Sequence, residues 1–552
     1  MKKISLLLFA LALLFGAKAF AQEWEYSYLL PDYIRGYMYN GFIDAHELSD
    51  GRIIAMGHFS DKNLCGNYVS HHPALLLLDS NGTELAFSEY YKDGYHGQDP
   101  YVLENESGEL YALTTFNPDH DTCSLNYYRN FDTITDHSIL GLYKLNDDLS
   151  IAKSYEYEIP IDTFEWRNES NSWFPYTTGH AWIYSAFVDD DGSIVGVYYK
   201  SVSLNIDEPR GYDSTVFFRM DFNGKILCRR SYCGNFRSGS LPLMEYQRQH
   251  IVKADSLYLH YGATHDVVSE DDRNLAFLDY DFNLVRSQSF KHHLAVSSPG
   301  NLMFFQNYNV KRNRQGKTYM TGSGIHHQYS YCCALYEYQD DMQQIGSNTP
   351  ISRYLRRNTP DRTYDVPCIN SCVDILDDNS LYFAYTLDIG MSYEGDSRVV
   401  IERLTPEFET VSTFFIGMED GICTNAQSIA ATRDGGLILV TSNYGLYAQK
   451  QYCSITKFPA EAFLSVEEAH ANGLKVAIAY PNPGGNEMHI RTAVENAAVE
   501  VYDMNGRLVA QQPVTETETV LDATDWAAGT YIWKVVSTQT AREIESGKWV
   551  KE

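Results

Sequence analysis

The stretch SDGRIIAMG at residues 49–57, followed by ALLLLDSNG at 74–82 and LAFSEY at 85–90, contains the unit on which the fold is built. A Ser-Asp-Gly turn begins the unit, a variable loop follows its first strand, and an Asn-Gly turn joins the last two strands. Apolar runs bounded by Gly, Asn, Asp and Ser predict β-strands. The unit therefore predicts an antiparallel sheet, with a further strand at 40–47 before the first turn.

This pattern returns seven times between Trp24 and Phe458. The third copy is nearly as clear as the first, with DGSIVGV at 191–197 and VFFRMDFNG at 216–224. Four antiparallel strands per repeat of about sixty residues are typical of a β-propeller. A stack of separate sandwiches is the alternative. It is disfavoured because a lone four-stranded sheet cannot bury both of its faces.

The seventh repeat lacks a recognisable fourth strand, since residues 452–458 lead directly into Pro459. At the other end of the chain, WEYSYLL at 24–30 has the form of the missing strand. We expect this segment to pair with the last repeat. Such pairing closes the ring and covers an edge that would otherwise be exposed.

The C-terminal residues form a different pattern, in which apolar and polar residues alternate on both sides of Asn505-Gly506. Alternation around Asn-Gly predicts a hairpin, and the whole segment predicts a small β-sandwich. The segment also resembles the type A C-terminal sorting domain of type IX secretion, through its Pro-Asn-Pro opening, Tyr-Asp-x-Asn-Gly-Arg hairpin, Gly-x-Tyr strand and Ser-Gly-Lys ending. The residues that carry the resemblance are Pro481, Asn482, Pro483, Tyr502, Asp503, Asn505, Gly506, Arg507, Gly529, Tyr531, Gly547 and Lys548.

The resemblance implies that the tail is an address read by the type IX secretion machinery and removed by its sortase. It further implies export through the periplasm to the outer cell surface or the medium, with a surface glycolipid as the attachment point if the product is retained.

The first residues agree with export. The layout is that of a cleaved signal peptide: Lys2-Lys3 come first, an apolar run at 4–15 follows, and Ala19-Phe20-Ala21 forms the cleavage site. The apolar run is too short to favour a membrane anchor. The predicted organisation is all-β: a signal peptide at 1–21, a seven-bladed β-propeller at 22–458, a linker at 459–475, and a small Ig-like sandwich at 476–552 that acts as the sorting domain.

Composition limits the partners. The net charge of −29 over 552 residues argues against nucleic acid and against charge-driven binding to an anionic membrane. No segment of the mature chain predicts a transmembrane helix. Among ten cysteines, Cys228 and Cys233, or Cys368 and Cys372, are close enough for local disulfides, with free buried thiols as the alternative.

Long loops are predicted on one side of the ring, which we call the long-loop face, and tight turns on the other. Functional residues concentrate on such loops. Aromatic rings beside amides and carboxylates suit glycans and protein ligands, although such rings also pack loops against a scaffold. The candidate ligand-binding residues are Tyr95, His96, Asp99, Trp166, Trp173, Tyr176, His180, His265 and Asp266.

Sequence motifs for metal binding or catalysis are weak. The pairs His71-His72, His292-His293 and His326-His327 do not chelate alone, because neighbours on an extended chain point opposite ways. Asp189-Asp190-Asp191-Gly192 lacks the spacing of a calcium loop and predicts a turn. We expect neither metal nor cofactor, and no catalytic residue can be assigned. Binding is therefore the favoured function, with a carbohydrate-active hydrolase or lyase, or a purely structural role, as alternatives.

Overall fold

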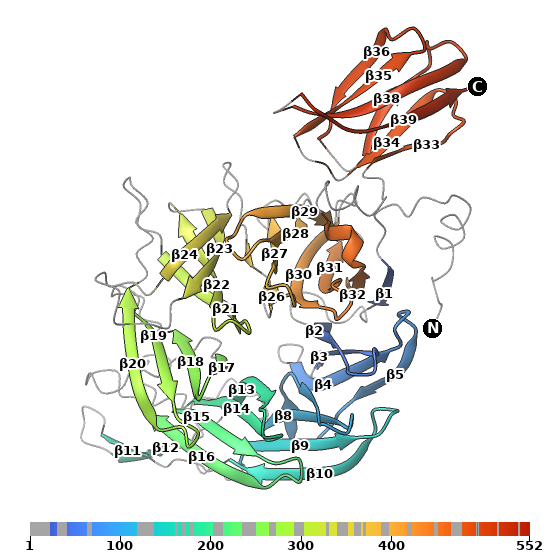
Figure 1. The fold of residues 1–552 in the computed structure, drawn as a ribbon. Coiled ribbons are helices and arrows are strands. Elements are labelled where there is room, and N and C mark those ends of the chain that lie inside the picture. The colour runs from blue at the N-terminus through green and yellow to red at the C-terminus, as the bar shows by residue number, and fades with distance from the viewer. Residues whose placement is uncertain are drawn as a thin grey trace. The chain divides into compact units, whose positions relative to one another are not determined.

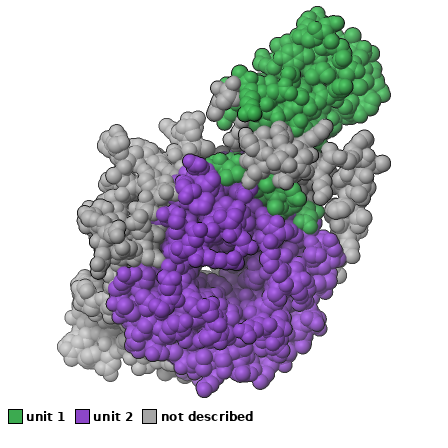
Figure 2. Space-filling model, viewed as in Figure 1, with its two compact units in different colours: residues 1–23, 410–414, 458–552 green, residues 24–409, 415–457 purple. Residues whose placement is uncertain are grey.

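The computed structural model describes residues 23–29, 41–62, 69–118, 137–159, 164–167, 173–176, 180–201, 214–233, 250–263, 272–291, 303–326, 330–338, 351–357, 366–367, 371–387, 397–416, 422–445, 451–464, 477–492, 494, 496–515, 518–538 and 541–552. The predicted signal peptide lies outside these residues. The chain divides into two compact units, coloured in Figure 2. Unit 2 contains Trp24–Glu409 and Phe415–Lys457, and unit 1 contains Phe458–Glu552 together with Met1–Glu23 and Thr410–Phe414.

Seven antiparallel sheets follow one another through the described part of residues 24–458 (Figure 1). Sheet 1 is β2 (Gly41–Glu47), β3 (Ile53–Lys62), β4 (Val69–Leu78) and β5 (Glu84–Glu89); sheet 2 is β6 (Tyr95–Gly97) and β7 (Tyr101–Glu104), both on β8 (Leu110–Pro118), then β9 (Ile139–Leu145) and β10 (Ile151–Glu158). Sheet 3 is β13 (His180–Val188), β14 (Ile194–Ser201), β15 (Ser214–Met220) and β16 (Ile226–Cys233); sheet 4 is β17 (His250–Ala254), β18 (Leu257–Ala263), β19 (Asp272–Leu278) and β20 (Leu284–Lys291).

Sheet 5 is β21 (Met303–Arg312), β22 (Thr318–His326), β23 (Ser330–Tyr338) and β24 (Ile351–Arg357); sheet 6 is β25 (Val366–Pro367) and β26 (Val373–Ile375), both on β27 (Leu381–Leu387), then β28 (Arg398–Leu404) and β29 (Thr410–Ile416). Sheet 7 is β30 (Ile422–Ala431), β31 (Leu437–Gly445), β32 (Gln451–Phe458) and β1 (Trp24–Leu29). A separate two-stranded hairpin joins β11 (Phe164–Arg167) and β12 (Trp173–Tyr176).

Successive sheets lie side by side, mostly through the early strands of each. Strand β4 contacts β6, β7 and β8 contact β13, β13 contacts β17, β17 contacts β21, β21 contacts β26, and β26 contacts β30. The last sheet returns to the first, because β2 contacts both β30 and β31. The space-filling view shows an opening in the middle of unit 2 (Figure 2). The all-β, propeller-like arrangement predicted from the repeats is therefore present.

The tight turns follow from local chemistry. In sheet 1, the Asp79 carboxylate accepts hydrogen bonds from the backbone N–H groups of Asn81 and Thr83, at 2.9 and 2.8 Å. Gly82 adopts a φ of +77°, and a Cβ there would lie 2.5 Å from the indole of Trp24. The turn therefore needs Asp79 to bind its backbone N–H groups. It needs glycine at position 82 because of the positive φ and because the Trp24 ring leaves no room for a Cβ.

Strand β1 confirms the predicted closure by the N-terminal segment. It pairs antiparallel with β32 from Trp24↔Lys457 to Leu29↔Tyr452. Trp24 is 7% exposed, and its indole N–H donates to the Ser80 carbonyl at 2.9 Å. The ring packs in a core formed by residues of sheets 1 and 7, including Phe42 and Ile455. The first described strand therefore joins the beginning of the chain to its last sheet.

The C-terminal residues form two sheets around one core: β33 (Ala477–Tyr480), β34 (Glu487–Thr492) and β37 (Glu518–Asp522) on one side, and β36 (Leu508–Pro513), β35 (Ala497–Asp503), β38 (Gly529–Ser537) and β39 (Glu543–Lys551) on the other. Both sheets contribute to the core, for example Ile490 from one and Trp533 from the other. A 3-10 helix, η4 (Ala460–Phe463), follows β32.

The separate motif elements of this tail meet in space. The Asn482 amide donates to the Lys548 carbonyl at 2.7 Å, and the Trp549 indole donates to the Pro481 carbonyl at 2.6 Å. A Cβ at Gly547 would lie 2.5 Å from the Trp533 ring. The Pro-Asn-Pro opening is therefore hydrogen-bonded to the segment that contains the Ser-Gly-Lys ending.

Both local disulfides considered from spacing are wrong. Neither Cys228 nor Cys372 is part of a disulfide, which removes the Cys228–Cys233 and Cys368–Cys372 pairs, and Cys453 forms no disulfide either. Within the described ranges, no helix is long and apolar enough to cross a membrane.

Candidate functional site

The predicted ligand-binding residues lie in three described segments and in one segment outside the described residues. Tyr95 and His96 lie on β6, and Asp99 follows that strand. Trp166, Trp173 and Tyr176 belong to the hairpin of β11 and β12, where Trp166 is paired with Phe174. His180 begins β13. His265 and Asp266 lie outside the described residues.

His96 and Asp99 belong to a set of polar side chains that we call the histidine cluster: His58, His71, His96 and Asp99. The His58 Nδ1 lies 2.5 Å from Asp99 Oδ1. The His58 and His71 rings meet edge to face with centroids 4.8 Å apart, and the His71 and His96 centroids are 6.5 Å apart. The structure therefore brings together residues of β3, β4 and β6.

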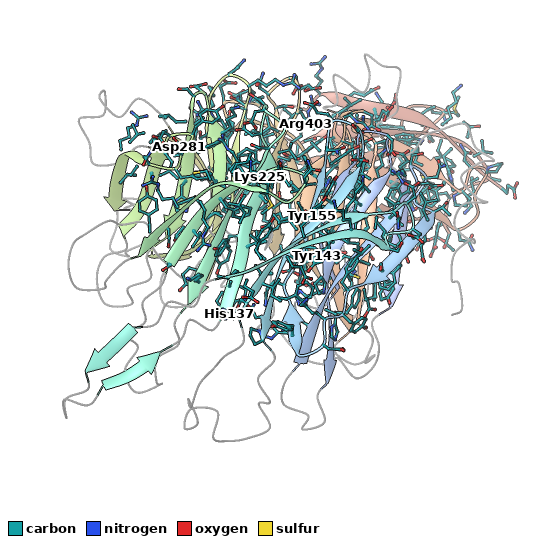
Figure 3. The ribbon with its side chains drawn as sticks, turned by 90° about the horizontal axis from the view of Figure 1, so that it is seen from below. His137, Tyr143, Tyr155, Lys225, Asp281 and Arg403 are labelled. Carbon is teal, nitrogen blue, oxygen red and sulfur yellow. The ribbon has the colours of Figure 1, made fainter. Side chains whose placement is uncertain are left out.

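The cluster lies at the end of the sheets where the long loops begin. His58 and His71 stand near residues 63–68, which connect β3 to β4, and His96 is paired with Asn117 close to the end of β8. His137, which precedes β9, lies at the opposite end of the sheets from Lys225 and Asp281 in tight turns (Figure 3). This is the location that strand order predicts for the long-loop face.

The pKa values of the two central histidines shift in opposite directions. Burial lowers the pKa of His58, but the adjacent Asp99 carboxylate raises it more, so the pKa lies above its usual range. Burial together with His58 lowers the pKa of His71 to about 4. At neutral pH His71 is therefore a neutral imidazole, which offers one donor and one acceptor.

His72 points away from this cluster, as expected for neighbours on a strand. It is 8% exposed and packs against Tyr91, with ring centroids 4.1 Å apart. Within the described part of the chain, no group of three or more His, Cys, Asp or Glu side chains is arranged to hold a metal ion.

A cavity of about 430 Å³, which we call the groove, lies between β5 and the strands β9 and β10. Lys92 Nζ contacts both carboxylate oxygens of Glu156, at 3.0 and 2.8 Å, and the Tyr143 hydroxyl donates to Glu156 Oε1 at 2.8 Å. Tyr143 is labelled in Figure 3. The Lys92 ammonium also lies 5.7 Å from the centroid of the Tyr95 ring, so the groove borders the segment that contains His96.

The groove combines an exposed ring with fixed charges. Tyr91 is 62% exposed and lines the groove. Burial raises the pKa of Glu156, but hydrogen bonds from Lys92 and Tyr143 lower it more, so the group is an ionised carboxylate. An aromatic face beside a carboxylate and an ammonium group can stack on a sugar ring and bond its hydroxyls.

Sequence reasoning missed five members of this region: His58, Tyr91, Lys92, Tyr143 and Glu156. The alternation Tyr155-Glu156-Tyr157-Glu158 on an outer strand was an available signal, because exposed acid and tyrosine alternate there without an apolar face. The sequence around His58 gives no sign that this residue differs from an ordinary strand residue. Its partner Asp99 is 41 residues away.

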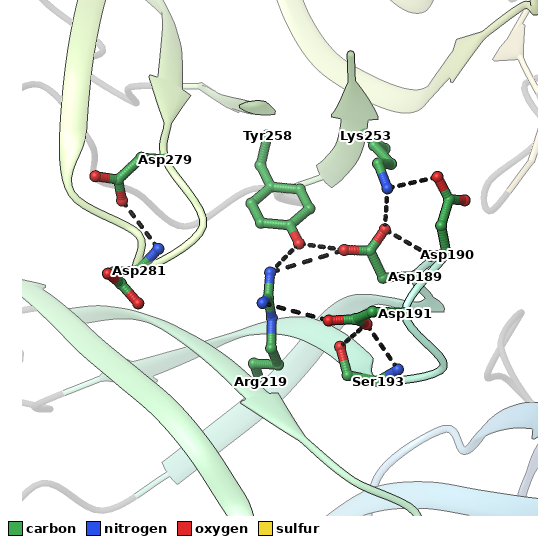
Figure 4. Close-up of polar contacts among 9 residues, drawn as sticks. All are labelled: Asp189, Asp190, Asp191, Ser193, Arg219, Lys253, Tyr258, Asp279 and Asp281. Carbon is green, nitrogen blue, oxygen red and sulfur yellow. Dashed lines mark hydrogen bonds and ion pairs between the residues drawn. The ribbon is translucent and has the colours of Figure 1, made fainter. Parts of the chain in front are cut away.

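Asp189-Asp190-Asp191-Gly192 forms a turn, as predicted, and the turn is also an electrostatic link between sheets 3 and 4 (Figure 4). The Asp189 side chain is 0% exposed; Lys253 Nζ lies 2.6 Å from it, and Tyr258 donates to it. Burial raises the pKa of Asp189, but bonds from Lys253 and Tyr258 lower it more. These groups are neutralised by one another, which makes the turn a structural element.

Asp189→Asn is expected to destabilise unit 2 by about 3–5 kcal/mol at neutral pH, because the buried partner of Lys253 is lost. Since the folded-state pKa is depressed, the stabilisation is present above the unfolded pKa of about 4 and disappears as pH falls through the folded value. Urea unfolding of the variant should therefore depend less on pH in that acidic window. The control is Asp190→Asn, whose side chain is 86% exposed although it contacts the same Lys253; it should cost about 1 kcal/mol or less. Equal losses for both variants would contradict the assignment.

The sheets and the tail define the class: an all-β protein with a C-terminal secretion-sorting domain. Residues 478–550 match the family model described as the secretion system C-terminal sorting domain. This domain directs type IX secretion, so the chain is exported to the cell surface or the extracellular space. No curated protein matches the chain.

Solved structures similar to this chain include PorZ, described as an essential bacterial surface component of the type IX secretion system of Porphyromonas gingivalis, at 13% identity and a TM-score of 0.43. The match covers 93% of this chain but only 59% of PorZ. The polysaccharide lyase Uly1 matches at 10% identity and a TM-score of 0.41, covering 79% of this chain and 99% of that one. The β-propeller domain of the Trilobed protease from Pyrococcus furiosus matches at 8% identity and a TM-score of 0.34, covering 76% and 95%.

Proposed function

We propose that the chain is an exported seven-bladed β-propeller that binds a glycan or protein ligand through its long-loop face. In this proposal residues 1–21 are a signal peptide, 22–458 the propeller, 459–475 a linker and 476–552 an Ig-like sorting domain that a sortase removes. The sorting domain supports the export step. Attachment to a surface glycolipid after cleavage belongs to the same proposal.

The groove carries the binding proposal. Its exposed Tyr91 ring lies beside the ionised pair of Lys92 and Glu156, in a cavity whose volume falls within the range of ligand pockets. A glycan is the ligand class that this chemistry favours, because sugars present both apolar faces and hydroxyl groups. The histidine cluster extends the polar surface next to the groove through Tyr95 and His96.

Tyr91→Ala is expected to weaken retention of the exported protein on its glycan by about tenfold or more, since removal of a central aromatic contact costs about 2 kcal/mol in typical interfaces. The measurement is a screen of microbial and host polysaccharides by affinity electrophoresis, followed by titration of any hit. Leu85→Ala is the matched control, because Leu85 is 51% exposed on β5, the strand that leads to Tyr91, but does not line the groove.

The same screen separates the alternatives. Release of reducing ends or unsaturated products from a retained polysaccharide would favour a hydrolase or lyase over a binding protein. Retention that Tyr91→Ala leaves unchanged would contradict binding in the groove, and absence of retention on every polysaccharide and surface protein tested would favour a structural role.

A further inference from the structure

Each sheet of the sorting domain packs one face on the shared core and turns the other face away from it. In the sheet of β36, β35, β38 and β39 (Figure 1), the core face holds Val501 and Trp533. Successive residues of a strand point to opposite faces, so their neighbours Tyr502 and Ile532 lie on the face away from the core.

Four residues form a line across this outward face, one from each strand. Each is paired directly with the next on the neighbouring strand, so their side chains lie beside one another. We call this line the outer row: Leu508, Tyr502, Ile532 and Lys548. Met504 lies in the turn beyond it and is not part of it.

The outer row has unused binding capacity. Leu508 is 46% exposed, and neither it nor Ile532 is part of the hydrophobic core. The Tyr502 hydroxyl donates at 2.5 Å to Glu500, which lies on the same face. Among the described residues, no carboxylate lies within ion-pairing distance of the Lys548 ammonium. Apolar side chains next to an unpaired cation are thus available to another molecule.

Two members of the outer row are also residues of the sorting motif. Other motif residues have a task inside the domain: the Asn482 side-chain oxygen, for example, accepts the Val550 backbone N–H at 3.0 Å. Tyr502 and Lys548 come from distant parts of the tail and point away from the core. Packing of the core therefore does not account for their place in the motif.

The outward face of the other sheet is different, because its polar groups bond to one another. The Glu518 carboxylate accepts the Tyr480 hydroxyl at 2.5 Å and lies 2.6 Å from His489 Nδ1. Arg491 donates to the Tyr480 hydroxyl at 3.0 Å. Val520, paired with His489, is 42% exposed on this face. It offers a position of matched exposure at which the two faces can be compared.

We propose that the sorting domain docks through the outer row on a protein of the type IX secretion machinery, whose surface presents apolar side chains and a carboxylate opposite Lys548. The family of the tail supplies the partner, because this domain directs type IX secretion. Charge disfavours a second copy of the chain or an anionic membrane, since each chain carries a net charge of −29. The proposal rests on the sorting role of the tail and names the face that is read.

Leu508→Asp is expected to lower the amount of chain at the cell surface about tenfold, because an unpaired charge would be buried in the contact. Val520→Asp is the matched control: β36 and β37 are both edge strands of their sheets, and the two side chains are similarly exposed. The control should keep delivery within about twofold of the parent level. Cell fractionation and protease accessibility of intact cells measure both.

Lys548→Glu is the second variant, because this side chain has no partner among the described residues whose loss could unfold the domain. It should also lower delivery about tenfold by placing two carboxylates together, whereas Lys548→Arg should retain delivery. Thermal unfolding of the purified full chain checks that each variant is folded. Parent-level delivery of both Leu508→Asp and Lys548→Glu would overturn the proposal, and so would an equal loss in Val520→Asp.

A photo-crosslinking amino acid placed at position 508 or 520 of the full chain identifies what covers each face in cells. We expect an adduct with a protein of the secretion machinery from position 508 and none from position 520. An adduct between two copies of the chain, or no adduct from position 508, would overturn the assignment of the partner. If removal of residues 476–552 blocks delivery while both outer-row variants are delivered normally, the sorting role stands and only this proposal fails.

Discussion

Removal of residues 476–552 is expected to abolish delivery of the chain to the cell surface and to leave a folded product in the periplasm. Residues 478–550 carry the match to the sorting domain, and their two sheets enclose a hydrophobic core of their own, with Val499, Trp533 and Trp549 among its members. Cell fractionation and protease accessibility of intact cells measure the outcome. Surface delivery of the truncated chain at the normal level would refute the sorting role.

A point variant tests whether the folded tail, and not its length, is what the machinery requires. Trp549 is 0% exposed and joins the ending of the motif to Pro481, so Trp549→Ala is expected to cost about 3–5 kcal/mol and to reduce export strongly. Met504→Ala is the control, because Met504 is 66% exposed at the Asn-Gly turn. Normal export of Trp549→Ala would show that packing of this core is not needed for recognition.

Deletion of residues 22–31 is expected to lower the unfolding midpoint of unit 2 sharply. Strand β1 supplies the outer strand of sheet 7, and its loss would expose the edge of β32 and remove Trp24 from the core shared with sheet 1. Trp24→Ala alone should cost about 3–5 kcal/mol by the same contacts. Thermal and urea unfolding, followed by tyrosine and tryptophan fluorescence, measure both effects.

Ser27→Ala provides the comparison for this strand. Ser27 is exposed on β1 and its hydroxyl lies 3.1 Å from that of Ser454, so its loss should cost about 1 kcal/mol. A deletion that leaves the midpoint unchanged would mean that sheet 7 is stable without its outer strand. The closure by the N-terminal segment would then have no energetic role.

The turns, the strands and the closing strand could be predicted because their signals are local or countable. Asp79 and Gly82 define a turn within four residues, through bonds that the same peptide would form elsewhere. The missing fourth strand of the last repeat pointed to β1, since an unpaired edge needs a partner. Local disulfides were predicted wrongly, because closeness in sequence does not determine where a Cys228 side chain points.

The candidate site was predicted in part. Tyr95, His96 and Asp99 lie together at the end of the sheets where long loops begin, which strand order alone implies. Their charged neighbours were not foreseen. Lys92 and Glu156 are 64 residues apart and meet only because sheet 2 packs beside sheet 1.

The sequence alone thus determined the strands, the repeat and the sorting tail. Their signals, hairpin turns and alternating apolar residues, lie within a few neighbouring positions of the chain. Side-chain neighbours across sheets depended on closure of the whole set of sheets. Asp44, Lys311 and Asp374 come from three different sheets, and they share one cavity wall only because β2, β21, β26 and β30 of neighbouring sheets lie side by side. No periodicity in the sequence encodes that meeting, since it depends on how hundreds of residues pack together.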